Sequence, residues 1–245
     1  MRKFFVKSNQ INDKIINIIG DDVNHIKNVL RLEKDTLIKI CDFDNKINYI
    51  CKIDTVSKEK IECSINQVAK NEAEGKVNLE IYQGLPKSDK MELIIQKGTE
   101  LGTSKFIPTK FERCVVKLEG KDEQKKIERW QKISEASAKQ SGRDIVPIID
   151  NIKNLSEIDV GLYDIVFLAY EEEKENSIKD ELKNIEKKES YNIAVIIGPE
   201  GGITEKEVNL LKEKGAKVVT LGNRILRTET VALYLSSVIM YELEM

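Results

Sequence analysis

The pattern of apolar and polar positions changes character about a third of the way along the chain. Before residue 70, polar breaks at 44–46 and 57–59 separate three apolar runs, which are Leu37–Phe43, Ile47–Val56 and Ile61–Val68. Apolar runs of this length, closely spaced and joined by short turns, predict the strands of a small barrel or sandwich.

A short helix and a domain boundary flank these predicted strands. Asp21 or Asp22 can cap a helix whose apolar side is formed by Val23, Ile26 and Leu30. The segment 70–76 is polar and contains no apolar residue larger than alanine. Because linkers between domains are typically polar and exposed, we expect a boundary there, between a domain of residues 1–70 and a domain of residues 77–245.

Beyond this boundary, strand patterns alternate with helical patterns. Helices are predicted from Ser88-Asp89 to Gly102, from about Asp122 to Gln140, and after the capping-box sequence 204–207. The predicted strands are Val77–Tyr82, Lys105–Ile107, Asp164–Ala169, Asn192–Ile197 and Lys217–Leu221. The last three of these are continuous apolar runs, as in strands that are covered on both faces. The alternation predicts an α/β domain with a mainly parallel sheet.

The last predicted helix, Thr230–Glu242, is apolar on nearly every side. A helix of this kind must be covered all round. We therefore expect it either at the centre of the core or in a subunit interface, and the second position implies a homodimer.

Composition excludes several kinds of chemistry. The chain has 245 residues, a formal net charge of −2 and a single histidine, His25, so a histidine-rich metal site and a two-histidine mechanism are excluded. The four cysteines form no C-x-x-C pair, so we expect no metal and buried free thiols, as in a reducing cytoplasm. No long apolar run follows the N-terminal charges, so we expect a cytoplasmic protein without signal peptide or membrane span.

Positive charge is concentrated between residues 105 and 143. This segment contains 11 lysines and arginines against 6 aspartates and glutamates, in a chain whose net charge is −2. A local excess of this kind is typical of a phosphate-contacting surface. The alternative is an ordinary solvated helix face, because acidic residues are interspersed among the basic ones.

Three loops follow predicted strands at the edge where open parallel sheets bind ligands. The first follows Leu168–Tyr170, the second is Gly198–Ile203 and the third is Gly222–Arg227. Glycines in the second loop permit positive φ and close approach of the backbone to a ligand. The loop matches neither the dinucleotide fingerprint nor the P-loop, and on the glycines alone a tight strand-to-helix turn is the simpler interpretation.

The third loop ends with Arg224 and Arg227, just before the sequence Thr228-Glu229-Thr230 that can cap the last helix. Cations are unfavourable at this end of a helix, because its dipole attracts anions. A bound anion or an acidic partner would offset that cost. The alternative is that both arginines are solvated surface residues.

Taken in order, several segments resemble the ribosomal RNA small subunit methyltransferase E family. The most specific are the paired segments Ile197–Gly202 and Leu221–Thr230. Upstream segments that are similar to signatures of the same family are His25–Arg31, Gln96–Gly102, Glu112–Cys114 and Gln140–Arg143. The resemblance covers nearly the whole chain.

This resemblance implies a fold and an activity that the hydrophobic pattern alone does not. The implied fold is a PUA-like RNA-binding β-barrel followed by a SPOUT α/β domain, whose C-terminal segment threads through a loop as a trefoil knot. Such threading is otherwise rare. The implied activity is methylation of N3 of a uridine in 16S rRNA of the small ribosomal subunit by a homodimer. The implied cofactor is S-adenosyl-L-methionine.

The resemblance also implies roles for residues of the three loops. Arg227 is expected to stabilise the uridine anion. Glu229 is expected to act either as a base or as a helix cap, and loss of the N3 proton directly to solvent stays open. Residues expected to hold the cofactor, mostly through backbone groups, are Leu168, Ala169, Tyr170, Ile197, Gly198, Gly202, Leu221, Gly222, Ile225, Leu226 and Arg227. Residues expected to contact RNA are Arg31, Arg113, Lys117, Lys139 and Arg143.

Other functions share part of these features. A 2′-O-ribose methyltransferase of the same superfamily would have a similar fold and a different target atom. A non-catalytic RNA-binding ribosome-assembly factor would need the barrel and the basic surface but not the glycine loops. A doubly wound nucleotide-binding enzyme is disfavoured, because the phosphate-binding fingerprints are missing.

Overall fold

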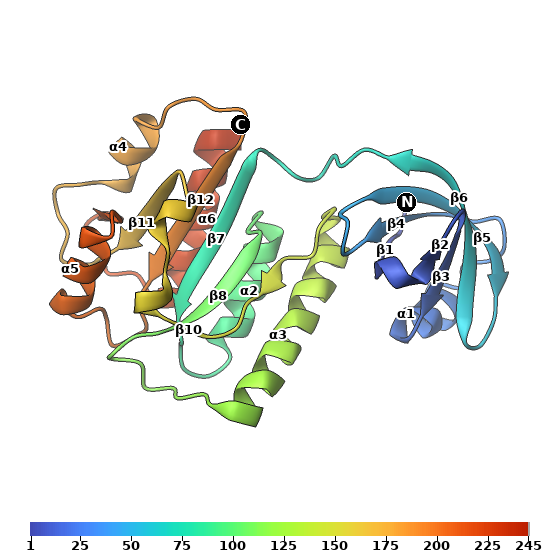
Figure 1. The fold of residues 1–245 in the computed structure, drawn as a ribbon, viewed down its shortest axis with the longest axis horizontal. Helices are drawn as coiled ribbons and strands as arrows, with labels where there is room; N and C mark the ends of the chain where they lie inside the picture. Colours follow the sequence, from blue (N-terminus) through green and yellow to red (C-terminus); the bar gives the residue numbers. More distant parts are fainter. Residues whose placement is uncertain (245) are drawn as a thin grey trace. The chain divides into compact units, whose positions relative to one another are not determined.

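The computed structural model describes residues 1–244, which form two compact units (Figure 1). The N-terminal unit consists of residues 1–74 together with residues 139–146, and the C-terminal unit consists of residues 75–138 and the residues from 147 onward. The change from one unit to the next, between Glu74 and Gly75, lies inside the polar segment 70–76. The hydrophobic pattern does not indicate that residues 139–146 pack with the N-terminal unit.

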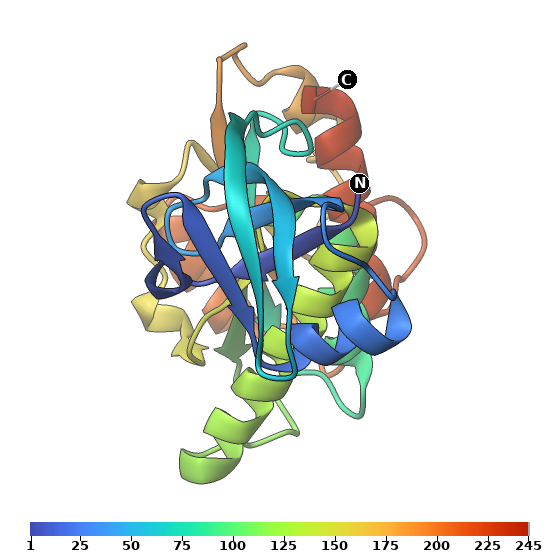
Figure 2. The same cartoon turned by 90° about the vertical axis from the view of Figure 1, so that its right-hand side faces the viewer.

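The N-terminal unit is built on a curled six-stranded sheet with the order β1-β4-β5-β6-β3-β2 (Figure 2). Its strands are β1 (Lys3–Val6), β2 (Ile11–Asn12), β3 (Ile15–Ile19), β4 (Leu37–Asp42), β5 (Asn48–Val56) and β6 (Lys60–Ala69). β1 and β4 are parallel, and the other neighbouring strands are antiparallel. The three predicted strands are confirmed as β4, β5 and β6. The short strands β1, β2 and β3 were not predicted.

The predicted helix of this unit is present, but its N-terminal cap was predicted wrongly. It begins as α1 (Asp21–Asn24) and continues as the π-helix η2 (His25–Val29), while η1 (Ser8–Gln10) is a 3-10 turn. The capping position is taken by Gly20, which has no side chain to offer, so Asp21 and Asp22 lie in the first turn instead.

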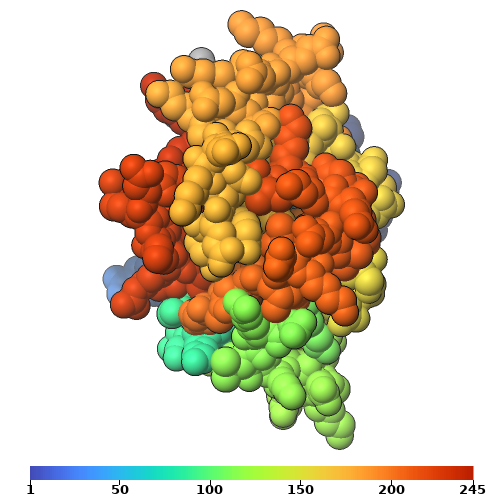
Figure 3. Space-filling view, turned by 90° about the vertical axis from the view of Figure 1, so that its left-hand side faces the viewer, coloured from blue at the N-terminus to red at the C-terminus, as the bar shows by residue number. Residues whose placement is uncertain are grey.

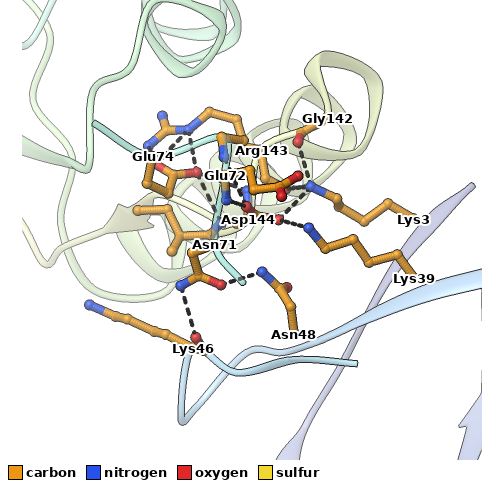
Figure 4. A network of polar contacts seen from close by, with 12 residues as sticks. Lys3, Lys39, Lys46, Asn48, Asn71, Glu72, Glu74, Gly142, Arg143 and Asp144 are labelled. Atoms are coloured by element: carbon orange, nitrogen blue, oxygen red, sulfur yellow. Dashed lines mark hydrogen bonds and ion pairs between the residues drawn. The ribbon is translucent and has the colours of Figure 1, made fainter. Parts of the chain in front are cut away.

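Two carboxylates, one buried and one half-buried, fix residues 139–146 to the N-terminal unit (Figure 4). The side chain of Asp144 is 0% exposed and lies 2.6 Å from Nζ of Lys3 and 2.8 Å from Nζ of Lys39. Its other oxygen accepts hydrogen bonds from the backbone N–H groups of Glu72 and Ala73. Burial alone would raise the pKa of Asp144, but these four hydrogen bonds outweigh burial and hold the pKa far below its ordinary value.

The second carboxylate, Glu74, neutralises Arg143. One of its oxygens lies 2.6 Å from Nη2 of Arg143, and it also accepts hydrogen bonds from Nε of Arg143 and from the backbone N–H groups of Asp144 and Ile145. Arg143 is buried. A buried arginine of this kind depends on its carboxylate partner, since an unpaired charge in the interior is strongly unfavourable.

The C-terminal unit contains a seven-stranded sheet in which every neighbouring pair is parallel. The main path of the sheet is β10-β8-β7-β12-β11-β13, and β9 pairs with β8. The strands are β7 (Val77–Gly84), β8 (Lys105–Lys110), β9 (Ile148–Ile149), β10 (Lys153–Asn154), β11 (Ile165–Ala169), β12 (Tyr191–Ile197) and β13 (Lys217–Val219). The predicted α/β class and parallel sheet are therefore confirmed. The two-residue strands β9 and β10 were not predicted.

Helices cover both faces of this sheet. Alternate residues of the central strands therefore belong to two separate apolar clusters, one on each face. In β12, Ile193, Val195 and Ile197 belong to one apolar cluster, while Ala194 and Ile196 belong to the other. The first cluster includes residues of α2 (Lys90–Glu100), α3 (Gly120–Ser141), α4 (Ile178–Lys183) and α6 (Thr228–Glu244). The second includes residues of α5 (Glu205–Glu213) and of the 3-10 turn η3 (Leu155–Glu157), and η4 (Val160–Leu162) packs nearby.

The start of α5 confirms the predicted capping box. The hydroxyl of Thr204 accepts a hydrogen bond from the backbone N–H of Glu207, whose carboxylate accepts one from the backbone N–H of Thr204. The start of α6 differs from the prediction, because Thr228 and Glu229 already form the first turn of that helix.

Only part of the surface of α6 is covered within this chain. Ala232, Leu235 and Ile239 are buried, but Tyr234 is 38% exposed and Tyr241 is 67% exposed. The single chain therefore does not bury this helix on all sides, and an apolar stripe remains open. The other expected position, in a subunit interface, stays a prediction.

Cys41, Cys51 and Cys63 are buried free thiols as predicted, and burial raises the pKa of each thiol to about 12. Cys114 is half-buried. Within residues 1–244, none of the helices is both long enough and apolar enough to cross a membrane.

Candidate functional site

The carboxyl ends of three neighbouring strands lie level with one another in the C-terminal unit. Ala169 of β11 pairs with Ile197 of β12 on one side and with Val219 of β13 on the other. The chain leaves all three strands at this edge, and a cavity of about 610 Å³ is formed by the loops that follow. Figure 3 shows the face on which the segments near residues 170 and 200–225 meet.

The structure brings nearly all of the predicted cofactor residues together. Those that line this cavity are Ala169, Tyr170, Ile197, Gly198, Gly202, Leu221, Gly222, Ile225, Leu226 and Arg227. Leu168 does not line it, because its side chain is fully buried in the apolar cluster on the α5 side of the sheet. Leu168 was assigned to the site together with Ala169 and Tyr170, at the start of the first loop, but neighbouring residues of a strand face opposite sides.

Two glycines allow the loops to turn sharply around the cavity. Gly202 has a φ of +75° and Gly222 has a φ of +108°, a region that residues with a side chain rarely adopt. The backbone N–H of Gly202 donates to the carbonyl of Pro199, which closes a turn at the end of β12. A side chain at either glycine would therefore strain the wall of the cavity.

The loop after β11 is hydrogen-bonded to the segment after β13. The backbone N–H of Tyr170 donates to the carbonyl of Val219, and the N–H of Thr220 donates to the carbonyl of Asn176. The N–H of Ile178 in turn donates to the carbonyl of Thr220. These hydrogen bonds fix the positions of two walls of the cavity relative to each other.

A charged cluster at the cavity joins three separate segments. Lys90, the first residue of α2, lines the cavity and lies 2.9 Å from a carboxylate oxygen of Glu200 and 3.4 Å from one of Glu229. The hydrogen bond to Glu200 is the largest factor that raises the pKa of Lys90, so this lysine stays protonated. Partial burial would raise the pKa of Glu200, but hydrogen bonds from Lys90 and from backbone amides outweigh it and lower that pKa.

The two residues predicted to be catalytic have different surroundings. Arg227 is exposed and lines the cavity, one residue before α6. Glu229 lies in the first turn of α6, with a side chain that is 14% exposed and paired with Lys90. The structure therefore gives Glu229 an ion-pair partner that sequence reasoning did not predict.

The predicted RNA contacts are divided between the two units. In the N-terminal unit, Arg31 is exposed and has a φ of +50°, while Lys139 forms an ion pair with Asp22 at 2.8 Å. Contrary to the prediction, Arg143 is buried against Glu74 and so does not belong to the exposed basic surface. The exposed residues Arg113 and Lys117 belong to the C-terminal unit.

Arg113 also supports the loop Gly198–Ile203, here called the glycine loop. Its Nη1 donates to the carbonyl of Gly201 at 3.3 Å, and a Cβ added at Gly201 would lie 2.9 Å from Cβ of Arg113. The basic segment 105–143 is partly neutralised, since Lys105, Arg129, Lys139 and Arg143 all form ion pairs.

Sequence reasoning missed Lys90 and the site role of Glu200. Lys90 begins the helix that follows β7, so its loop also leaves the sheet at the carboxyl edge. Applying the same strand-end rule to β7 would have pointed to this segment. Glu200 lies within the glycine loop, but its role in the site could not be inferred without knowing that Lys90 is its ion-pair partner.

The chain combines an all-parallel sheet that has a glycine-lined cavity at its carboxyl edge with a small curled β-unit, and two family models identify this combination as an RNA methyltransferase. A family model described as an RNA methyltransferase domain matches residues 73–240, and one described as an RNA methyltransferase PUA domain matches residues 18–66. The chain belongs to the ribosomal RNA small subunit methyltransferase E family.

Two curated relatives carry that name. The protein from Bacillus subtilis is 37% identical over 100% of this chain and 98% of its own length. The protein from Mesomycoplasma hyopneumoniae is 33% identical over 96% of this chain and 97% of its own length. Among solved structures, ribosomal RNA small subunit methyltransferase E from Neisseria gonorrhoeae, bound to S-adenosyl methionine, is 29% identical. Its TM-score is 0.83, with 98% of this chain and 97% of that chain covered.

The cavity of this chain fits S-adenosylmethionine in size and in chemistry. Its volume of about 610 Å³ lies within the range of small-molecule sites. Ile197, Leu221 and Leu226 offer apolar contact for an adenine ring, while the sharp turns at Gly202 and Gly222 bring the loop backbone close to the cavity. Charged groups at Lys90 and Glu200 can meet the amino-acid part of such a molecule.

Proposed function

We propose that this protein transfers a methyl group from S-adenosylmethionine to N3 of a uridine in 16S rRNA of the small ribosomal subunit, in the cytoplasm. The observation that carries the proposal is the cavity at the carboxyl edge of the parallel sheet, formed by the same loops that carry the family's paired motifs. The relatives named above, and the neighbour bound to S-adenosyl methionine, support the target and the cofactor.

The loops supply binding and orientation. S-adenosylmethionine supplies an activated methyl group on a sulfonium, so the protein needs to position and desolvate rather than activate. The cavity residues from the three loops, from Ala169 to Arg227, would hold it mainly through backbone groups and apolar contact. The hydrogen bonds between the 170–178 loop and Thr220 keep these walls in place before any ligand arrives.

Arg227 is the residue we propose to stabilise the reacting uridine. N3 of uridine becomes a good nucleophile only after it loses its proton, and the resulting negative charge spreads onto O2 and O4. A guanidinium at the cavity can donate hydrogen bonds to such oxygens. Arg227 lines the cavity and is exposed enough to meet a base that enters from solvent.

Two routes for the N3 proton remain in the proposal. Glu229 could accept it, since its carboxylate lies near the cavity residue Lys90. The ion pair with Lys90 also gives Glu229 a structural role at the start of α6, and in that case the proton is lost directly to solvent.

RNA contacts are proposed for the exposed basic residues Arg31, Arg113 and Lys117 and for the half-buried Lys139. Phosphate contacts by such side chains supply affinity without reading sequence. The PUA-domain match over residues 18–66, which includes Arg31, supports an RNA-contacting role for the N-terminal unit.

We also propose that the protein is a homodimer whose interface uses α6. Tyr234 and Tyr241 are exposed along this helix, and Val231 and Val238 are half-buried beside them. Aromatic side chains are enriched at protein interfaces, where their large apolar area is removed from water. A second copy of the chain that covers this stripe would complete the burial that the apolar sequence of α6 demands.

A trefoil knot is the last part of the proposal. β13 lies at the edge of the sheet next to β11, yet α6, which follows it, packs against α2, β7 and β12. Between them the chain passes the 170–178 loop, to which Thr220 is hydrogen-bonded. Passage of the C-terminal segment through that loop accounts for this path.

The test uses purified protein, labelled S-adenosylmethionine and 30S subunits from cells that lack the protein. Digestion of the 16S rRNA and mass spectrometry of the nucleosides are expected to reveal 3-methyluridine. A 2′-O-methylated nucleoside would support the ribose methyltransferase instead. Absence of both cofactor binding and methylation would support a non-catalytic RNA-binding protein.

A further inference from the structure

A single buried side chain lies behind both cofactor loops. Gln83 is the next-to-last residue of β7, is fully buried, and pairs in register with Ile197, the last residue of β12. Its Nε2 donates to Oγ1 of Thr228 at 2.8 Å, and that hydroxyl donates to the carbonyl of Gly198 at 2.7 Å. One chain of hydrogen bonds thus runs from the sheet, through the start of α6, to the glycine loop.

The direction of these bonds is determined by chemistry. A hydroxyl has one hydrogen, and the carbonyl of Gly198 can only accept, so the hydroxyl of Thr228 must donate its hydrogen to that carbonyl. Oγ1 of Thr228 must then accept from Gln83. Nε2 of Gln83 also donates to the carbonyl of Gly84 at 3.0 Å, which is a second acceptor that fixes the orientation of the amide.

Close packing makes this bridge rigid. A Cβ added at Gly84 would lie only 2.5 Å from the backbone nitrogen of Pro199, so the end of β7 abuts the glycine loop directly. Gly198 and Thr228 line the cavity, whereas Gln83 does not. Gln83 therefore influences the cavity only through the groups that it holds.

The bridge also joins the two loops that the cavity needs. Gly198 begins the glycine loop, and Thr228 directly follows Arg227, the last residue of the other loop. Residues 204–221, which include α5 and β13, separate these loops. Without a tie between them, each could shift separately, and a ligand would have to order both.

We infer that Gln83 is a positioning residue, which through Thr228 holds the two loops in the arrangement that binds S-adenosylmethionine. The inference rests on the proposed function, since it concerns the same cavity. It assigns to Gln83 no contact with cofactor or RNA. The effect of losing the bridge is a weaker binding of the cofactor, because binding must then also order the loops.

The test compares Gln83→Leu, Thr228→Val and Thr228→Ser, measuring the Kd for S-adenosylmethionine by calorimetry, the Tm, and kcat at saturating cofactor. Gln83→Leu and Thr228→Val are expected to raise Kd by about tenfold, as a loss of preorganisation does, with a much smaller effect on kcat. Thr228→Ser keeps the hydroxyl and is expected to restore most of the affinity. The double variant Gln83→Leu/Thr228→Val is expected to have a Kd no higher than that of the single variant that binds more weakly, because both substitutions break the same bridge.

A matched control is Ser134→Ala, which removes a buried hydrogen bond of 2.7 Å to the carbonyl of Pro147, away from the cavity. It is expected to lower Tm without changing Kd. If Gln83→Leu and Thr228→Val behave in the same way, with lower Tm and unchanged Kd, the inference is overturned and the bridge is only structural. If the unaltered protein does not bind S-adenosylmethionine, the proposed function itself fails, and this inference with it.

Discussion

Nζ of Lys90 lies 2.9 Å from a carboxylate oxygen of Glu200, which joins the start of α2 to the glycine loop. The same ammonium group lies 3.4 Å from Glu229 in the first turn of α6. One cation thus serves two carboxylates that come from segments more than a hundred residues away from it in the sequence. The cluster lies at the cavity and makes it sensitive to a change at position 90.

Replacement of Lys90 by alanine is expected to lower kcat/KM for methyl transfer by about tenfold. The two carboxylates would then face each other without a counter-ion, so the glycine loop and the start of α6 would repel each other. Steady-state kinetics on 30S subunits measure the effect. Lys90→Arg keeps the charge and should retain most activity, and an equal loss in both variants would contradict the electrostatic explanation.

Arg227→Ala is expected to reduce kcat by about 100-fold, since the uridine anion loses a charged donor. Binding of S-adenosylmethionine, measured separately by calorimetry, should change much less. Arg129→Ala, which removes an exposed arginine of α3, is the matched control and should leave kcat unchanged. Full turnover in the Arg227 variant would remove this residue from the chemistry. Loss of cofactor binding in a folded protein would assign it to the pocket instead.

Asp144→Asn is expected to destabilise the N-terminal unit by about 3 kcal/mol, because Lys3 and Lys39 would lose their buried counter-ion. Chemical denaturation at neutral pH measures the difference in the free energy of unfolding. Asp13→Asn, at an exposed turn position, is the control. Equal stability of the two variants would mean that the ion pairs contribute nothing.

The same carboxylate predicts a dependence of stability on pH. The pKa of Asp144 is far lower in the folded protein than its ordinary value of about 4. Its stabilising effect is therefore complete above that ordinary pKa and is lost as the pH falls below it, toward the folded value. Denaturation curves measured at falling pH should show a steeper loss of stability in the natural sequence than in Asp144→Asn. Parallel pH profiles would contradict the assignment.

Tyr241→Glu is expected to shift the protein from dimer to monomer, because it places a charge in the exposed apolar stripe of α6. Sedimentation equilibrium measures the mass. The matched control is Leu162→Glu, since Leu162 is 68% exposed and Tyr241 is 67% exposed in the single chain. A monomeric natural protein, or a dimer that tolerates Tyr241→Glu, would contradict the proposed interface.

The strands that were predicted correctly share one property, which is a recognisable apolar pattern in their own sequence. β11 and β12 are continuous apolar runs because both faces are covered, and β4 to β6 are long enough to show their pattern. β1, β2 and β3 have between 2 and 5 residues, and β1 pairs with β4 more than thirty residues away. Such short strands are specified by their partners rather than by their own sequence.

The site residues in loops that follow strands could be predicted from the sequence. The ion pairs between residues far apart in the sequence could not. The strand-end rule and the family motifs pointed to the residues around Gly198 and Gly222. The partners of Glu229 and Arg143 could not be inferred in the same way, because Lys90 and Glu74 are ordinary charged residues until the chain brings them together. The error at Arg143 has this origin, since a basic residue in a basic segment does not reveal that it is buried.

The membership of residues 139–146 in the N-terminal unit has a consequence for how this architecture can be taken apart. A fragment that ends at Glu74 carries Lys3 and Lys39 but lacks Asp144, and it keeps Glu74 without Arg143. The N-terminal unit therefore cannot be transferred to another protein by a single cut in the linker, because its stabilising ion pairs would be lost. Exchange of this unit between proteins would require two separate stretches of sequence, residues 1–74 and 139–146, to be moved together.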